Sequence, residues 1–154
     1  MMTQEEYREI IKARMSEKRY IHSLNVEKEA VRLAEKYGAD VKKAAVAGIL
    51  HDITKETSFD EQLKIIENSG IILNDIQKSA PKLWHSISGA AYVKDVLGIC
   101  DEDIFNAIRY HTTARADMSL LEKVIFIADF TARSEITKVL TKCEKEPTKA
   151  LNRL

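Results

Sequence analysis

Cysteine is scarce in this sequence, and its two cysteines, Cys100 and Cys143, lie far apart with no CxxC spacing. This pattern predicts two ordinary thiols in a reducing compartment, with no disulfide framework and no zinc–thiolate site. A net charge of either sign is also absent, because 24 basic residues balance 24 acidic ones. A balanced charge argues against nonspecific nucleic-acid binding, which needs a basic face. A small anionic ligand is still compatible with it, since a local metal centre can supply positive charge.

Long apolar runs are missing as well. No run reaches the length of about 18 residues that a membrane-spanning helix needs. The N-terminal segment MMTQEEYREI is polar and acidic, and it resembles neither a signal peptide nor a transit peptide. We therefore expect a cytoplasmic protein that binds neither nucleic acid nor membranes, with an oligomeric state that the sequence leaves open.

Signals for β-strands are nearly absent, whereas apolar residues recur at helical spacing through most of the chain. We expect about seven or eight helices, which begin after Thr3, Ser16, Asp40, Ser58, Pro81, Asp101, Ser119 and Ser134. The segment VIFIA at 124–128 could alternatively form a buried strand, but the capping pair Ser119 and Glu122 favours a helix.

These patterns predict an all-α fold with a single domain over residues 1–154. Its core spans about residues 16–133, and residues 134–154 form a C-terminal helical tail. The helix that follows Asp40, VKKAAVAGILHDI, is apolar nearly all round and should be the most buried. A charged aspartate at the end of such a helix needs an ion partner or a metal, because its burial is otherwise costly.

All four histidines belong to one ordered series with aspartates. The series is His22, the adjacent pair His51 and Asp52, His85, His111, and Asp129. Imidazole and carboxylate are common ligands of first-row metal ions, although a lone histidine on a helix is usually a surface or hydrogen-bonded residue. Six ligands exceed the three protein ligands of a catalytic zinc ion. They suit two metal ions that share a bridging carboxylate, an arrangement used in phosphoester hydrolysis.

The order H…HD…H…H…D resembles the HD-domain metal-dependent phosphohydrolases. Five segments resemble the YqeK-type branch of bacterial symmetrical bis(5'-nucleosyl)-tetraphosphatases: RYIHSLNV, GILHDITK, HSISGA, AIRYHTT and SLLEKVIFIAD. The resemblance implies an HD-domain helical bundle that cleaves diadenosine tetraphosphate into two ADP through a metal-activated hydroxide. It also implies two divalent metal ions, with iron favoured and manganese, cobalt, zinc or magnesium as alternatives.

The resemblance further implies roles for single residues. His22, His51, Asp52 and Asp129 would hold one metal, and Asp52 would bridge to a second metal held by His85 and His111. Asp52 and Lys55 would have catalytic roles. The candidates for substrate binding are Arg19, Lys55, Thr112, Thr113 and Arg133.

Each substrate-binding candidate has a structural alternative. Lys55 and Arg19 could be solvated surface residues, and the two threonines could cap the end of a helix. Trp84 beside His85 could stack on a base, but core packing is the favoured interpretation. Arg109 and Arg115 are weaker phosphate-binding candidates. The chain also departs from the family pattern at Ala114, where glycine is usual, and after Asp129, where the segment reads FTARSEITK.

Two other functions are compatible with these residues. The first keeps the chemistry and changes the substrate, as in a nucleotidase or pyrophosphohydrolase that acts on another nucleotide. The second is a non-catalytic nucleotide or metal sensor, which the presence of all six ligands disfavours.

Overall fold

The computed structural model describes residues 2–133, and these residues form a helical bundle without β-strands. The α-helices are α1 (Gln4–Arg14), α2 (Glu17–Tyr37), α3 (Val41–Leu50), α4 (Phe59–Asn68), α5 (Asp75–Lys78), α6 (Trp84–Asp95), α7 (Glu102–Arg109) and α8 (Leu120–Arg133), with one 3-10 turn, η1 (Pro81–Leu83). The expected all-α fold is therefore confirmed. The predicted C-terminal tail, residues 134–154, and Cys143 lie outside the described residues.

Side-chain caps fix most of the helix starts at the predicted residues. The Thr3 hydroxyl accepts a hydrogen bond from the Glu6 N–H, and the Glu6 carboxylate accepts one from the Thr3 N–H in return. The side chains of Ser16, Asp40 and Asp101 cap α2, α3 and α7, and each accepts one hydrogen bond from a backbone N–H in the first turn of its helix. The segment VIFIA is helical within α8, so the strand alternative is wrong there.

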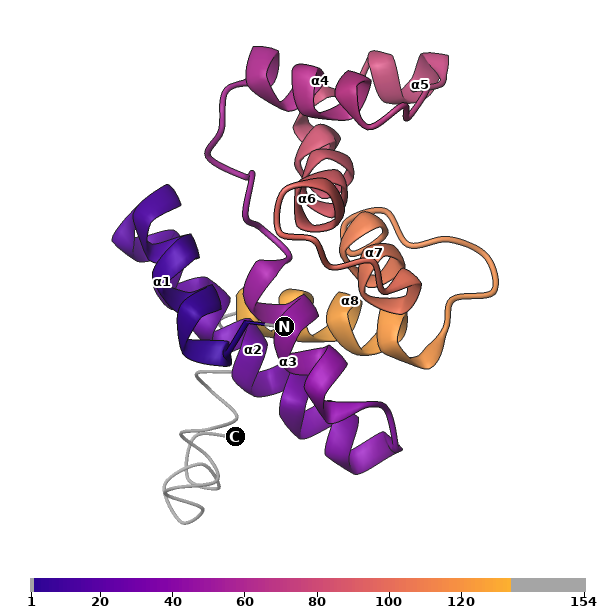
Figure 1. Cartoon of the computed structure of the whole chain (residues 1–154). Helices are drawn as coiled ribbons and strands as arrows, with labels where there is room; N and C mark the ends of the chain where they lie inside the picture. Colours follow the sequence, from indigo (N-terminus) through magenta and orange to yellow (C-terminus); the bar gives the residue numbers. More distant parts are fainter. Residues whose placement is uncertain (1, 134–154) are drawn as a thin grey trace, which may run out of the picture.

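Helix α2 forms the centre of the bundle, because it packs along both α3 and α8 (Figure 1). Gly48 makes the approach of α3 to α2 possible, since a Cβ atom at this position would lie 3.0 Å from the Glu27 Cα. The second half of α3 is buried throughout, including Ala47, Ile49 and Leu50, but α6 has 8 of its 12 residues buried against 6 of 10 in α3, so α3 is not the most buried helix as predicted. The close contact of α2 and α3 sets the spacing of the side chains at the end of α3.

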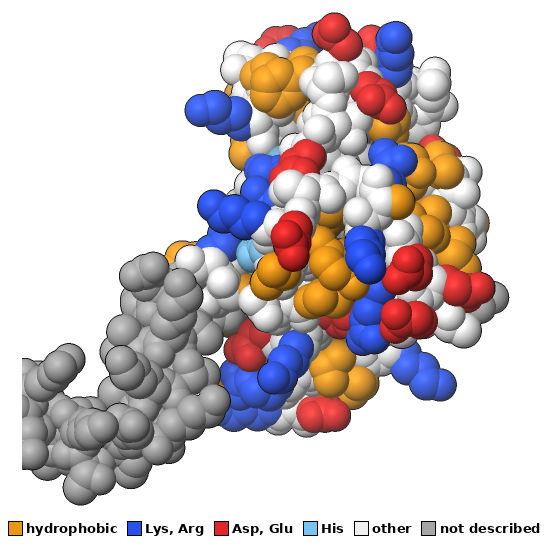
Figure 2. Space-filling model, turned by 90° about the vertical axis from the view of Figure 1, so that its left-hand side faces the viewer, with side chains coloured by type: hydrophobic (Ala, Val, Ile, Leu, Met, Phe, Trp, Pro, Cys, Tyr) orange, Lys and Arg blue, Asp and Glu red, His pale blue; other side chains and the backbone are white. Residues whose placement is uncertain are grey.

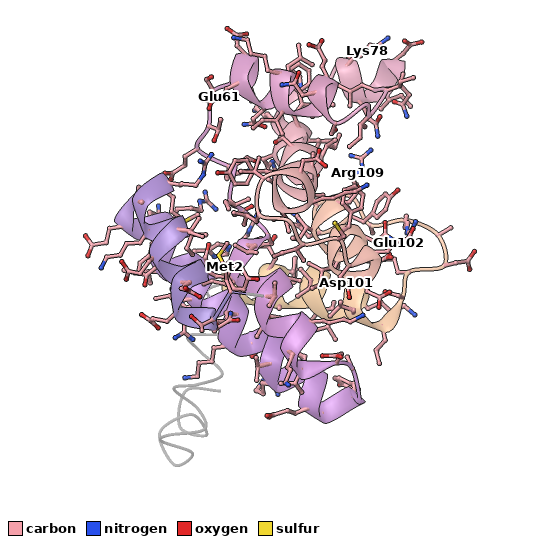
Figure 3. All side chains as sticks on the ribbon, viewed as in Figure 1. Met2, Glu61, Lys78, Asp101, Glu102 and Arg109 are labelled. Carbon is pink, nitrogen blue, oxygen red and sulfur yellow. The ribbon has the colours of Figure 1, made fainter. Side chains whose placement is uncertain are left out.

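Helices α4 and α5 form an outer layer above α6, with Glu61 and Lys78 toward its two ends (Figure 3). A small apolar cluster of Ile66, Leu73 and Ile87 joins this layer to α6. A groove of about 590 Å³ opens beside the cluster. Trp84 lines the groove and donates from its indole Nε1 to the Gln77 carbonyl, so it packs within the protein as the structural alternative predicted.

The structure differs from the sequence prediction at the end of the helix that follows Asp40, which was expected to continue through Ile53. Helix α3 ends at Leu50 and α7 ends at Arg109, so His51 and His111 follow their helices. After Leu50 the backbone makes tighter turns, in which the Lys55 N–H donates to the Asp52 carbonyl. Helix α5 was not predicted from its four residues. No helix among the described residues is long and apolar enough to cross a membrane.

Candidate metal centre

The six predicted metal ligands lie together in the interior of the bundle. They come from distant parts of the chain: His22 from α2, His51 and Asp52 from the turn after α3, His85 from the first turn of α6, His111 from the turn after α7, and Asp129 from α8. Five of them are buried, and the His22 side chain keeps 13% of its surface exposed. The centre is therefore closed on most sides and reaches solvent beside His22.

Asp52 lies between two pairs of histidines. Its Oδ2 atom is 3.4 Å from His51 Nε2 and 3.9 Å from His22 Nε2. Its Oδ1 atom is 3.4 Å from His111 Nε2 and 3.6 Å from His85 Nε2. Each carboxylate oxygen thus faces its own pair of imidazoles, which is the geometry that a bridging carboxylate needs.

Asp129 completes the Oδ2 side of this arrangement. Its Oδ1 atom is 2.9 Å from His22 Nε2 and 3.4 Å from His51 Nε2. The ligand atoms of His22, His51 and Asp129 all lie within 4.8 Å of one another, as do those of His51, Asp52 and His111. Two ligand atoms that share one ion at about 2.1 Å lie about 3.0 Å apart when they are adjacent and about 4.2 Å apart when they are opposite, so the distances between these ligand atoms fit metal coordination.

Backbone carbonyl groups fix the tautomers of three histidines. The Nδ1–H groups of His51, His85 and His111 donate to the carbonyls of Gly48, Lys82 and Ile108, at 2.7, 2.9 and 2.6 Å. A carbonyl oxygen only accepts hydrogen bonds, so Nδ1 carries a proton and Nε2 is the ring nitrogen that points into the centre. This orientation is typical of metal-ligating histidines.

Several polar atoms at the centre lack hydrogen-bond partners. They are Nε2 of His51, Nε2 of His111 and Oδ1 of Asp52, all buried. Buried polar atoms are nearly always hydrogen-bonded, and these three atoms point toward one another. Their donor set of imidazole nitrogen and carboxylate oxygen fits a divalent first-row metal ion.

The two carboxylates dominate the electrostatics of the centre. Burial by itself lowers the pKa of His51, but Asp52 and Asp129 outweigh it and raise this pKa to about 10. Burial would raise the pKa of Asp129, yet contacts with His22 and His51 hold it well below its usual range. Burial lowers the pKa of His85 to about 3, so this imidazole is neutral at pH 7 and able to ligate a metal. The Asp52 side of the centre therefore attracts cations.

Comparison with known proteins identifies this arrangement. A model of the HD domain family matches residues 19–134, the range that contains all six side chains. The chain belongs to the HD domain family. The family match confirms the resemblance to HD-domain proteins that the sequence analysis drew from His51, Asp52 and the other residues of the series.

The relatives of this HD domain include symmetrical bis(5'-nucleosyl)-tetraphosphatases. The one from Bacillus subtilis is 43% identical over 129 residues, which are 84% of this chain and 69% of the relative. The one from Staphylococcus aureus is 38% identical over 129 residues, which are 84% of this chain and 66% of the relative. This chain thus spans about two thirds of the length of these proteins.

A solved structure resembles this HD domain over most of its length. It is that of a predicted HD superfamily hydrolase involved in NAD metabolism from Clostridium acetobutylicum. The similarity has a TM-score of 0.84 with 39% sequence identity, and it covers 95% of this chain and 79% of the other. Both the helical fold and the hydrolase class of the sequence analysis agree with this comparison.

Three cationic side chains of the HD domain border the metal centre. The Arg19 Nη1 lies 2.9 Å from Asp52 Oδ2, and the Arg133 Nε lies 2.8 Å from Asp129 Oδ1. The Lys55 Nζ lies 3.3 and 3.4 Å from the two ring nitrogens of His85, and burial lowers its pKa. Figure 2 shows lysine and arginine side chains gathered around the exposed edge of the histidines. This edge presents positive charge to an anionic ligand.

The two threonines after His111 differ in position. The Thr112 hydroxyl lies 3.3 Å from His85 Nε2, at the border of the centre. The Thr113 hydroxyl is exposed and donates to the carbonyl of Ala114 instead. Arg115 makes a bidentate ion pair with the buried Glu122, which assigns it a structural role.

Sequence reasoning missed two polar groups that support the centre. The Glu56 carboxylate accepts from the N–H and hydroxyl of Ser16, each at 2.6 Å, and lies 3.9 Å from Arg19 Nε. The Thr54 hydroxyl donates to the His85 carbonyl at 2.9 Å. Thr54 and Glu56 belong to the segment that follows the His-Asp pair, so their position in the sequence was the available signal.

Proposed function

We propose that this chain hydrolyses dinucleoside tetraphosphates symmetrically and releases two nucleoside diphosphates. For diadenosine tetraphosphate, one water molecule is added at the middle of the tetraphosphate and two ADP leave. The names of the relatives from B. subtilis and S. aureus support this substrate class. The observation that carries the catalytic part is the position of Asp52, whose two oxygens face two separate pairs of histidines.

We assign two divalent metal ions to this centre. His22, His51, Asp52 and Asp129 would hold the first ion, and Asp52, His85 and His111 would hold the second. Iron is the favoured metal, and manganese, cobalt, zinc and magnesium are alternatives, since imidazole and carboxylate bind all of them. Bound ions would supply positive charge to the phosphates and a lower pKa to water.

The remaining charged side chains would bind and orient the tetraphosphate. Arg19 and Arg133 offer guanidinium groups on the Asp52 and Asp129 side, where bidentate contacts to phosphate oxygens are available. Lys55 lies on the His85 side and would neutralise negative charge that develops during cleavage, which is the catalytic role assigned to it. Thr112 would donate its hydroxyl to a phosphate oxygen, and Thr113 remains a more peripheral candidate.

Product analysis tests the function directly. The chain would be purified anaerobically, loaded with Fe²⁺, Mn²⁺, Co²⁺, Zn²⁺ or Mg²⁺, and incubated with diadenosine tetraphosphate. Chromatography should detect ADP as the sole product, because symmetrical cleavage yields nothing else. Release of ATP with AMP would contradict the symmetrical reaction. Cleavage of mononucleotides alone would favour the nucleotidase alternative, and no hydrolysis with any metal would favour the sensor.

The extent of the catalytic unit is part of the proposal. We propose that residues 1–154 form one HD domain, with its core over about 16–133 and a helical tail over 134–154. The predicted cytoplasmic location also stays a prediction. Because the chain spans about two thirds of the length of its relatives, the activity assay should use the chain itself.

A further inference from the structure

Two buried hydroxyl groups connect the halves of the metal centre. The Thr54 Oγ1 lies 2.9 Å from the His85 carbonyl oxygen and 2.8 Å from the Ser88 Oγ. The Ser88 Oγ lies 3.5 Å from the same carbonyl. Both residues are fully buried, so these hydrogen bonds form without competition from solvent. Thr54 follows Asp52 by two residues, and Ser88 follows His85 by three.

These hydrogen bonds link α6 to the turn after α3, and α6 and α3 themselves make few contacts. Helix α6, which carries His85, packs mainly against α7 and α4, whereas Asp52 follows α3. Helix α6 nevertheless lies close to the turn after α3 at Gly89, where a Cβ atom would make ordinary contacts of 3.4 Å with Thr54 Oγ1 and 3.6 Å with the His51 carbonyl oxygen. The hydroxyl pair is thus the polar contact that sets the position of the His85 backbone relative to this turn.

We infer that Thr54 and Ser88 are positioning residues for the second metal ion. This inference rests on the proposed dinuclear centre, in which Asp129 would hold the first ion and His85 the second. By holding the His85 carbonyl, Thr54 keeps the Nε2 of His85 at 3.6 Å from Asp52 Oδ1. Neither hydroxyl forms a hydrogen bond with His22, His51 or Asp129. The loss of either hydroxyl should therefore weaken binding of the second ion more than binding of the first.

The test measures binding of Mn²⁺ to the whole chain. Thr54→Val keeps the shape of the side chain and removes the hydroxyl, and Thr54→Ser retains the hydroxyl. Thr57→Val is the matched control, since the Thr57 hydroxyl makes no hydrogen bond to the described residues. Isothermal titration would count the ions, and electron paramagnetic resonance would detect the magnetic coupling of two neighbouring Mn²⁺ ions.

We expect Thr54→Val to bind the first Mn²⁺ normally and the second about 10–100-fold more weakly, as seen when groups that orient metal ligands are removed. The coupled spectrum should disappear at Mn²⁺ concentrations that saturate the wild type. Thr54→Ser should restore it, and Thr57→Val should not lose it. Ser88→Ala, in which Thr54 still holds the carbonyl, should show a smaller change of the same kind.

Two results would overturn the inference in distinguishable ways. Thr54→Val with two unweakened ions would refute the positioning role alone and leave the dinuclear centre standing. A wild type that binds one ion would refute both. If Thr54→Val does not fold, as judged by circular dichroism, Ser88→Ala decides, and an unchanged second ion in that variant would count against the inference.

Discussion

His22 and Asp129 lie 107 positions apart in the sequence, yet the Nε2 of one and the Oδ1 of the other are 2.9 Å apart. The contact joins α2 to α8, the two helices that pack side by side through the centre of the bundle. Both side chains face the same Oδ2 side of Asp52. The proposed first metal position would therefore depend on the packing of α2 against α8, whereas the proposed second position would depend on α6 and α7.

Removal of the bridging carboxylate should abolish turnover. Asp52→Ala takes away the one side chain whose oxygens face both pairs of histidines, so activity should fall on the order of 1,000-fold or more. Hydrolysis of diadenosine tetraphosphate measures the effect, and circular dichroism should find the helical content unchanged. Asp60→Ala, at an exposed position on α4, is the control and should keep full activity. Near-normal turnover in Asp52→Ala would refute the bridging role.

Loss of single histidines should separate the two metal positions. His22→Ala removes a ligand that faces Asp129, and His85→Ala removes one that faces Asp52 Oδ1. Elemental analysis of anaerobically purified protein should find about two ions per wild-type chain. His85→Ala should lose about one ion, because it keeps all the ligands proposed for the first ion. Unchanged metal content in His85→Ala would speak against a dinuclear centre.

Ala114→Gly should stabilise the protein. Ala114 follows the His111 turn with a φ of 58°, a left-handed conformation that costs a residue with a Cβ about 1–2 kcal/mol. Glycine removes this strain but makes the unfolded chain more flexible, which costs about 0.4–1 kcal/mol. We therefore expect a net gain of about 0.5–1 kcal/mol and a rise in Tm of about 1–4 °C. Thermal unfolding measures it.

A matched substitution nearby provides the control for this prediction. Ala116 is exposed and lies outside the left-handed region, so Ala116→Gly brings only the added flexibility of the unfolded chain and should lower Tm. Equal effects of the two substitutions would mean that backbone strain at Ala114 contributes little.

The ion pair of Asp101 and Lys43 should make stability depend on acid pH. The Asp101 Oδ2 lies 2.9 Å from Lys43 Nζ. Burial alone would raise the pKa of Asp101, but the Lys43 ammonium and the Ile104 N–H lower it. Because the folded-state pKa is below the unfolded value of about 3.9, this carboxylate stabilises the fold above about pH 4. The contribution is lost as the pH falls through the folded-state pKa.

Asp101→Asn tests this dependence, since asparagine keeps the N-cap of α7 and removes the charge. The difference in unfolding free energy between wild type and variant should shrink as the pH is lowered from about 5 to about 2, measured by urea unfolding. A constant difference for Asp101→Asn would contradict the role of the ion pair.

Much of the metal centre could be predicted because its residues are chemically distinctive. Histidine beside aspartate at the end of the apolar segment AAVAGIL required partners, and the remaining histidines were the available ones. Helix starts were equally readable from Thr3, Ser16 and Asp101, whose caps act within one turn of the chain. Local chemistry therefore predicted both the helices and the identity of the candidate ligands.

The supporting contacts could not be predicted in the same way. The hydrogen bond from Thr54 to the His85 carbonyl and the contact of Glu56 with Ser16 join segments 31 and 40 residues apart. Threonine and glutamate are common on helical surfaces, and which partners they find across the bundle depends on how the helices pack. The end of α3 was missed because the chain after Leu50 turns more tightly, with hydrogen bonds such as that from the Ile53 N–H to the Leu50 carbonyl, and the residues HDI do not mark this change.

Three imidazole rings are each anchored to a carbonyl one turn earlier in the same segment: His51 to Gly48, His85 to Lys82, and His111 to Ile108. The orientation of each ring therefore depends on the local backbone, and it should be lost when the helices of the bundle separate. A bound transition metal would act as an internal reporter of bundle integrity, because its spectrum depends on where those backbones stand. In a denaturant series, loss of the metal signal should coincide with loss of helical structure.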